Sequence, residues 1–252
     1  MFAGAVLSCT APRAIWRPAP GTSWQWQLTG TIETSLQVAM YDVDLFTAPN
    51  SALHALARRG VKIICYFSAG TYEPDRPDVG ALPRAVIGKR VAGWPDERWL
   101  DIREPSVRAL MRARIDRAAK RGCDGVEPDN VDGYTNDTGF PLTAADQRAF
   151  AVFIAAEAHA RRLSVGLKND LDQVPDLVAH FDWALDEECL EYDECDALAP
   201  FVAAHKAVFH VEYGDKATAA RVCSAVRARG FDTLIKHRSL DAFRIACASS
   251  TR

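Results

Sequence analysis

The sequence has no apolar run long enough to cross a bilayer, and it shows neither internal repeats nor low-complexity segments. It also lacks an excess of basic residues, because 30 Lys and Arg against 33 Asp and Glu give a net charge of −3. This balance argues against the basic surfaces with which proteins bind nucleic acids or anionic membranes. What remains is a chain of 252 residues whose 48% hydrophobic content is ordinary for a globular protein.

Metal-binding patterns are missing as well. The chain has only 6 histidines and no Cys-x-x-Cys motif, whereas a zinc site needs closely spaced His or Cys ligands. His210 and His237 lie in strand patterns, where a histidine is more often a packed core residue than a ligand. We therefore expect no metal and no other cofactor.

The 7 cysteines indicate the compartment. Two pairs are placed for disulfides, one across a short loop and one between helical patterns beside the last strand: Cys189–Cys195 and Cys223–Cys247. A further link, Cys65–Cys123, is a weaker prediction, because cysteines in strands are often plain buried hydrophobes. Two such pairs favour an oxidising compartment, although a cytosolic protein could carry the same thiols reduced.

The seventh cysteine, Cys9, ends the stretch MFAGAVLSC, which resembles the cleavage region of a truncated bacterial lipoprotein signal. The following APRAIWRPAPGTS is rich in Pro and small residues and is typical of a tether. We expect a signal remnant and tether over 1–22 and one domain over 23–252. The protein would then be secreted, or held at the cell envelope by a lipid on Cys9. The alternative is a disordered start with a chance cysteine.

Strand-like and helix-like segments alternate after the tether. The strand-like runs are 38–46, 61–69, 99–102, 124–128, 163–169, 182–187, 207–213 and 232–237. Eight strands alternating with helices predict an α/β fold, a single-domain (β/α)8 TIM barrel, with WQWQL (24–28) as an extra N-terminal strand or lid outside the eight. A doubly wound sheet is the alternative, but the turn after its second strand reads SAGTYEP instead of a Gly-rich phosphate loop.

Functional residues of a TIM barrel lie at the C-terminal ends of its strands. Here those ends and the turns after them carry polar, mostly acidic residues: Asp42, Tyr66, Asp101, Asp129, Asn130, Asp132, Tyr134, Lys168, Asn169, Glu187, Glu188, Glu212 and Tyr213. Taken singly, Asp129 could merely cap a turn and Glu187 could be a solvated acid. Two carboxylates facing one pocket are, however, what hydrolysis of a glycosidic bond requires.

Five segments carry a family resemblance: CYFSAGTYEPDRPD, WPDERWLDIR, GCDGVEPDNVDGY, GLKND and DEECLEYDEC. In this order, from about Trp24 to Cys247, the chain resembles glycoside hydrolase family 114, the endo-α-1,4-polygalactosaminidase family. The resemblance implies a TIM barrel that hydrolyses galactosamine-containing polysaccharide. It also implies that Asp129 and Glu187 occupy the family's two acidic positions. Glu188 and Glu212 remain alternatives for the second carboxylate.

By analogy with barrel α-glycosidases, we assign Asp129 as the nucleophile and Glu187 as the general acid and base. The other strand-end residues are expected to bind substrate, and the acidic run DEECLEYDECD would attract a partly cationic sugar polymer. A monomer is expected. One alternative is a non-catalytic glycan-binding barrel at the cell surface, which would keep the aromatic residues and lose the acids. Another is a metal-assisted hydrolase, which a chelator would inactivate.

Overall fold

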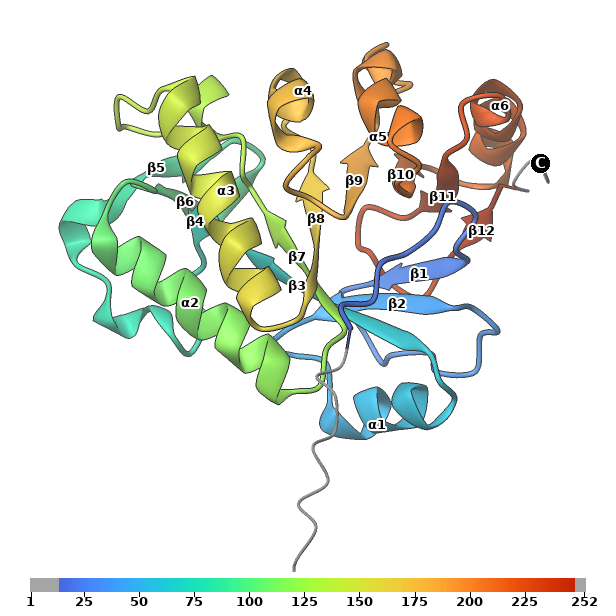
Figure 1. Cartoon of the computed structure of the whole chain (residues 1–252), viewed down its shortest axis with the longest axis horizontal. Coiled ribbons are helices and arrows are strands. Elements are labelled where there is room, and N and C mark those ends of the chain that lie inside the picture. Colours follow the sequence, from blue (N-terminus) through green and yellow to red (C-terminus); the bar gives the residue numbers. More distant parts are fainter. Residues whose placement is uncertain (1–13, 248–252) are drawn as a thin grey trace, which may run out of the picture.

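Eight parallel strands form a curved sheet in the computed structural model, which describes residues 14–247 (Figure 1). They are β1 (Trp24–Gln27), β2 (Met40–Asp44), β3 (Lys62–Ser68), β7 (Gly125–Asp129), β8 (Ser164–Lys168), β9 (Trp183–Glu187), β10 (Val208–Tyr213) and β11 (Asp232–Lys236). Their order in the sheet follows their order in the chain, with no reversal. This topology is that of a (β/α)8 barrel, and it excludes a doubly wound sheet.

Helices follow most of the strands and cover the outside of the sheet (Figure 1). They are α1 (Asn50–Arg58), α2 (Pro105–Lys120), α3 (Ala144–Ala160), α4 (Val174–Leu177), α5 (Ala199–Ala203) and α6 (Lys216–Val226). Short 3-10 turns lie at Val79–Ala81, Arg84–Val86, Gly133–Thr135, Leu171–Gln173 and Cys195–Leu198. The start of α3 is fixed by a capping box, in which Thr143 and Asp146 each bind the other's backbone N–H.

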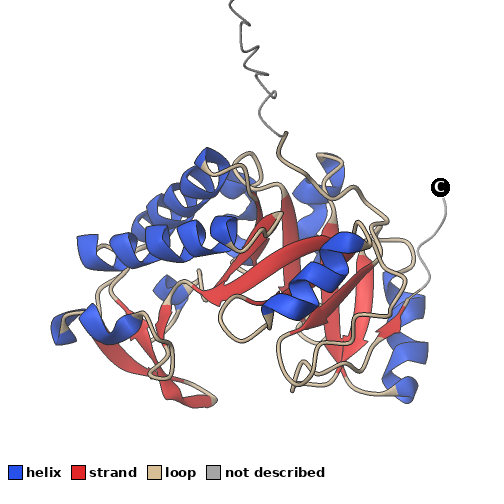
Figure 2. Ribbon diagram, turned by 90° about the horizontal axis from the view of Figure 1, so that it is seen from below, coloured by secondary structure: helices blue, strands red, loops and turns tan. Residues whose placement is uncertain are grey.

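A small antiparallel sheet is inserted between β3 and α2, and Figure 2 shows it at the lower left. It consists of β4 (Thr71–Tyr72), β5 (Ile87–Val91) and β6 (Trp94–Leu100), in the order β4-β6-β5. The prediction that 99–102 forms a barrel strand is therefore wrong. Leu100 pairs with Ile87 instead, because the chain folds back through a tight turn in which Gly93 has φ +81°.

The place of the eighth barrel strand is taken by β1. The sequence predicted this strand correctly but placed it outside the eight; the structure pairs it in parallel with β2. Trp24 and Trp26 are buried in one hydrophobic cluster inside the barrel. Gln25 and Gln27 are also buried, and their side-chain amides donate to the backbone oxygens of Ala242 and of the segment after β1. The alternating Trp and Gln side chains thus point to opposite faces of β1, and both faces are buried.

The barrel is closed between β11 and β1 by side chains, since the parallel backbone ladder stops there in residues 14–247. Trp24 Nε1 donates to the Asp232 carbonyl oxygen at 2.8 Å, and the buried Lys236 Nζ lies 3.2 Å from Gln25 Oε1. Arg244 Nε donates to the Trp24 carbonyl at 2.8 Å. A short strand, β12 (Ile245–Ala246), pairs antiparallel with the other edge of β11.

All three expected disulfides are present: Cys65–Cys123, Cys189–Cys195 and Cys223–Cys247. The first was the weaker prediction, and it joins β3 to the segment before β7. No helix within 14–247 is long and apolar enough to span a membrane. The lipid proposed for Cys9 concerns a residue outside the described range.

The described part of the expected tether contacts the barrel. Arg17 Nε lies 2.5 Å from Asp182 Oδ1, and the Gly21 N–H donates to the Asp232 carboxylate at 3.0 Å. Residues 14–22 therefore lie against the strands rather than apart from them.

Candidate active site

The strands direct alternate side chains into the barrel, so their sequence sets what lies at each level. On β9, Trp183 and Leu185 belong to the interior hydrophobic cluster, and Glu187 follows two residues later on the same face. This alternation places Glu187 on the same inward face of β9 as Trp183 and Leu185. Glu188 follows the end of the strand with φ +63°, and its side chain pairs with Arg238 at 2.6 Å.

A cavity of about 940 Å³ opens at the C-terminal ends of the strands. It is lined by most of the residues that the sequence predicted for the site: Tyr66, Asp129, Asn130, Asp132, Tyr134, Lys168, Asn169, Glu187, Glu188 and Tyr213. These residues come from five different strands and the loops that follow them. The structure therefore gathers side chains that are distant in sequence around a single cavity.

Lys168 connects the two candidate catalytic carboxylates. Its Nζ lies 2.9 Å from Asp129 Oδ1 and 2.5 Å from Glu187 Oε2. Burial alone would lower the pKa of Lys168, but the acids around it hold that pKa well above the usual value. The ammonium is therefore charged, and it holds the two carboxylates close to each other.

Asp129 is held by further donors. Its Oδ1 accepts from the Asn130 backbone N–H at 2.7 Å, and its Oδ2 accepts from the Tyr66 hydroxyl at 3.1 Å. Burial and the Asp129 charge raise the pKa of Tyr66, so this hydroxyl stays a donor. Asn130 has φ +59°, a left-handed conformation that Asn tolerates well. Both oxygens of Asp129 thus have fixed positions.

Glu187 has its own positioning residues. The Tyr213 hydroxyl donates to Oε1, and the Glu187 N–H donates to Asn169 Oδ1 at 3.1 Å. Burial first, and then the Glu187 charge, raise the pKa of Tyr213. Asn169 therefore orients the backbone of the second carboxylate, while Tyr213 orients its side chain.

A second carboxyl pair lies one level lower in the barrel. Glu127 precedes Asp129 by two residues on β7 and faces the same interior, where it contacts Asp42 from β2. Both are buried, and Glu127 Oε2 accepts from Trp26 Nε1 at 3.0 Å. Glu127 was not among the residues predicted for the site, although its position in GVEPD, two residues before Asp129, predicts the same face of the strand.

Three predicted site residues do not line the cavity. Asp42 is fully buried beneath it, in contact with Glu127. Asp101 forms a bidentate pair with Arg103, because the segment that carries it is not a barrel strand. Glu212 is buried against His210 at 3.0 Å and accepts from the Leu190 N–H at 2.9 Å, and these bonds outweigh burial and lower its pKa. Glu212 is therefore unsuited to replace Glu187.

Several acids in the cavity wall have raised pKa values. Burial is the main cause, and neighbouring acids add to it: the pKa rises to about 8 for Asp170 and Asp186 and to about 7 for Glu97. An approaching cation favours the ionised form of each carboxyl. The cavity wall is thus suited to a positively charged ligand.

One His/Cys/Asp/Glu group within residues 14–247 is close enough to suggest a metal site: Cys189, Cys195 and His210. The two cysteines form a disulfide, so they offer no thiolate for a metal. This group is a structural feature of the loop after β9.

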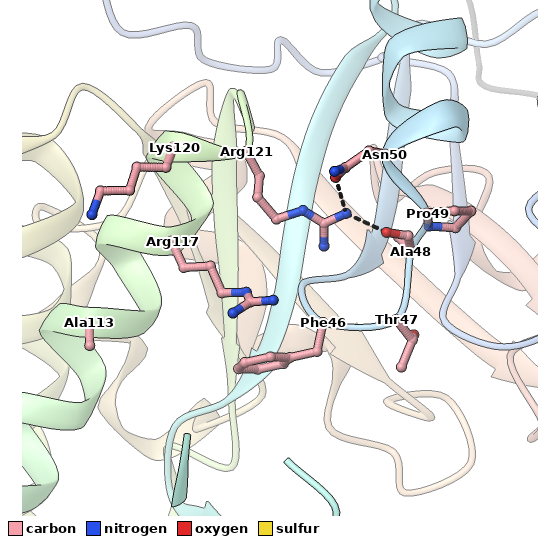
Figure 3. Close-up of a pocket in the computed structure, with 9 residues that line it drawn as sticks. All are labelled: Phe46, Thr47, Ala48, Pro49, Asn50, Ala113, Arg117, Lys120 and Arg121. Atoms are coloured by element: carbon pink, nitrogen blue, oxygen red, sulfur yellow. Dashed lines mark hydrogen bonds between the residues drawn. The ribbon is translucent and has the colours of Figure 1, made fainter. Parts of the chain in front are cut away.

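A second hollow, of about 570 Å³, lies on the outside of the barrel between α2 and the segment before α1 (Figure 3). Basic side chains of α2 line it, and Arg121 donates to Asn50 Oδ1 at 3.1 Å and to the Ala48 carbonyl. No carboxylate lines this hollow. The acidic cavity is therefore the candidate active site.

Comparisons with known proteins identify the family and the fold. The model of glycoside-hydrolase family GH114 matches residues 6–252. A crystal structure of Aspergillus fumigatus Ega3 in complex with galactosamine is similar with a TM-score of 0.88 and 42% identity, covering 94% of this chain and 99% of that chain.

Two further similarities extend over most of the barrel. The glycoside hydrolase domain of PelA from Pseudomonas aeruginosa shares the fold, with a TM-score of 0.68 and 14% identity over 89% of this chain and 97% of that chain. An uncharacterized protein of Deinococcus radiodurans is 27% identical, over 86% of this chain and 81% of its own length.

Proposed function

Because the chain belongs to glycoside-hydrolase family GH114, we propose that it cleaves α-1,4-linked galactosamine-containing polysaccharide with Asp129 and Glu187. One observation carries the assignment of residues: both carboxylates contact the same buried ammonium, that of Lys168, in the one acidic cavity at the strand ends. The substrate class is supported by the similarity to Ega3, whose structure contains galactosamine.

In the proposed reaction, Glu187 first takes up a proton, and Asp129 then attacks the anomeric carbon while Glu187 gives that proton to the leaving oxygen. The glycosidic C–O bond breaks, and the sugar is left as an ester on Asp129. Glu187 then takes a proton from a water molecule, whose oxygen displaces Asp129 from the anomeric carbon. The donors on both Asp129 oxygens support its role as a positioned nucleophile.

The spacing of the pair supports retention of anomeric configuration. Asp129 Oδ1 and Glu187 Oε2 both contact Lys168 Nζ, at 2.9 and 2.5 Å, so these two oxygens are at most about 5.4 Å apart, although the carboxyl carbons can be further apart than the oxygens. Retaining enzymes keep their carboxyl groups about 5–5.5 Å apart, whereas inverting enzymes leave about 6.5–9.5 Å for a water molecule. We therefore propose the retaining course.

The charge of the cavity supports an amino sugar as substrate. Asp132, Asp170, Asp186 and Glu97 line the cavity, and burial raises the pKa of each. Ammonium groups on the polymer would favour the ionised form of these acids. A neutral, fully N-acetylated polymer lacks this attraction and is expected to be the poorer substrate.

The three disulfides support action outside the cytoplasm. Attachment through a lipid on Cys9 is part of this proposal, and mass measurement of protein from the membrane fraction tests it. An unmodified Cys9 in that fraction would remove the anchor and leave the compartment assignment in place.

The decisive experiment incubates the protein with a partly deacetylated galactosamine polymer and identifies the products by mass spectrometry. The wild type is expected to release oligomers, while Asp129→Asn and Glu187→Gln lose about three or more orders of magnitude in rate. Asp137→Asn is the matched control, since Asp137 is exposed and binds Lys89 outside the cavity. A wild type that binds the polymer without cleaving it would support the glycan-binding alternative instead.

A further inference from the structure

Only two large hydrophobic side chains are exposed in the part of the chain that the structure describes. Trp94 is 61% exposed and Tyr192 is 65% exposed, and both line the acidic cavity. An exposed indole leaves a large apolar area in water, and such exposure on a folded surface commonly marks a binding site. Their shared location at the cavity suggests a common ligand.

Trp94 stands on the Asp129 side of the cavity. It is the first residue of β6, directly after the turn at Gly93, and its sheet follows β3, whose Ser68 pairs with Asp129. Trp94 pairs with Val91 of β5 across this turn, and at the start of the insertion the fully buried Arg114 binds Asp78 at 2.9 Å and the Ser68 carbonyl at 2.6 Å. The insertion is therefore tied to β3, and Trp94 is held at the cavity rather than on a free loop.

Tyr192 stands on the Glu187 side. It lies in the loop after β9, which the Cys189–Cys195 disulfide closes. Two further bonds fix this loop: the Tyr192 N–H donates to the Glu188 carbonyl at 3.1 Å, and the Leu190 N–H donates to Glu212 at 2.9 Å. The ring is thus presented on a braced loop, which lowers the entropy lost when a ligand binds.

The two rings lie on different sides of the acid pair. In the sheet order, the insertion follows the third strand, and the Tyr192 loop follows the sixth, with β7 and β8 between them. In a closed barrel of eight strands, directly opposite loops are four positions apart, so loops three positions apart lie on well-separated parts of the rim. A chain laid over Asp129 and Glu187 can therefore reach one ring at each end.

We propose that Trp94 and Tyr192 are two stacking platforms for amino-sugar units on opposite sides of the bond that is cleaved. This inference rests on the proposed function and deepens it. The apolar face of a sugar ring covers the aromatic face, and an ammonium group near the ring adds a cation–π attraction. The acids between the platforms complement the charge of a polymer that carries free amino groups.

The test measures binding in the Glu187→Gln background, by calorimetry with galactosamine oligomers of increasing length. Affinity is expected to rise with length until the oligomer reaches both rings. Trp94→Ala and Tyr192→Ala are each expected to weaken binding of the longest oligomer about tenfold and to leave that of the shortest unchanged. Trp94→Phe and Tyr192→Phe keep a ring and are expected to retain most of the affinity.

Arg90→Ala and Glu191→Gln are matched controls, since both residues lie near the two rings in sequence but do not line the cavity. Unchanged affinity in both alanine variants would overturn the platforms, as would an equal loss for all oligomer lengths. An outcome that contradicts the proposed function can be told apart from one that contradicts the platforms. If the wild type does not cleave the polymer while the length-dependent loss is observed, the reaction is wrong and the platforms stand.

Discussion

Asp42 on β2 and Glu127 on β7 are buried neighbours inside the barrel, one level below Asp129 and Glu187, and each shifts the pKa of the other. Two carboxyl groups can form a hydrogen bond only when one of them keeps its proton. Burial raises the pKa of Asp42 to about 7 and that of Glu127 well above the usual value, each opposed in part by the Lys168 charge. This shared proton limits the negative charge beneath Lys168, whose Nζ lies 3.8 Å from Glu127 Oε1.

The raised pKa of Asp42 predicts a pH-dependent stability. The pKa of Asp42 is about 7 in the folded protein against an ordinary 3.8, so the proton is bound more tightly after folding. Its contribution is fully present below about pH 4 and is lost as the pH rises to about 7. The melting temperature is therefore expected to fall between about pH 4 and pH 7, and to fall less in Asp42→Asn.

Thermal unfolding followed by circular dichroism over this pH range checks the prediction. Asp170, Asp186 and Asp232 also have raised pKa values and contribute a similar fall in both proteins. The difference between the wild type and Asp42→Asn in the slope of melting temperature against pH therefore gives the contribution of Asp42. Parallel curves would show that Asp42 holds no proton in the folded state.

Lys168 is expected to be required for catalysis. Lys168→Met removes the ammonium that positions Asp129 and Glu187, and we expect kcat to fall by about two to three orders of magnitude. Lys89→Met, which breaks an exposed pair with Asp137, serves as the control and keeps full activity. A loss of less than tenfold in Lys168→Met would mean that the pair is positioned without this ammonium.

The roles of the two acids predict different responses to an activated substrate. A good leaving group needs little protonation, so an aryl galactosaminide is expected to restore the first step in Glu187→Gln but not in Asp129→Asn. Burst kinetics of aryl release measure that step. Equal restoration in both variants would contradict the assigned roles, and inversion of the anomeric centre, followed by NMR, would contradict the ester intermediate.

The disulfides are expected to stabilise the fold by different amounts. Cys65–Cys123 closes 58 residues and Cys189–Cys195 closes 6, so chain entropy gives about 4 and about 2 kcal/mol respectively. Replacing each pair by serine and measuring denaturation in urea tests this order, after mass spectrometry of a non-reduced digest has verified the links. A larger loss for the short loop would contradict the entropic account.

The sequence predicts the barrel well because alternation of strands and helices sets its topology. It misplaces two segments whose local patterns are ambiguous. The run 99–102 is short and apolar, like a barrel strand, but it follows a hairpin turn at Gly93. In β1, Gln25 and Gln27 look solvent-exposed, yet both are buried and bound to backbone oxygens supplied by other segments. Only the tertiary contacts decide these two cases.

The site residues also divide into those that the local sequence predicts and those that only the tertiary structure reveals. Asp129 is directly indicated by its strand end, and the choice of Glu187 over Glu188 depends on where β9 ends. Asp42 was expected at the surface of the pocket, but its strand position puts it one level below. Trp94 and Tyr192 belong to an insertion and a loop, and no periodicity in the sequence indicates that both border the same cavity.

The side-chain closure between β1 and β11 also determines when a newly made chain can become active. Trp24 and the Asp232 carbonyl are 208 residues apart, so β1 leaves the ribosome long before its last contacts exist. Until then, the two tryptophans of β1 have no complete interior to enter, and the cavity above them lacks a wall. Contacts this distant are slow to form. The nascent polypeptide is therefore expected to have no activity until its last strands have been synthesised and have packed against β1.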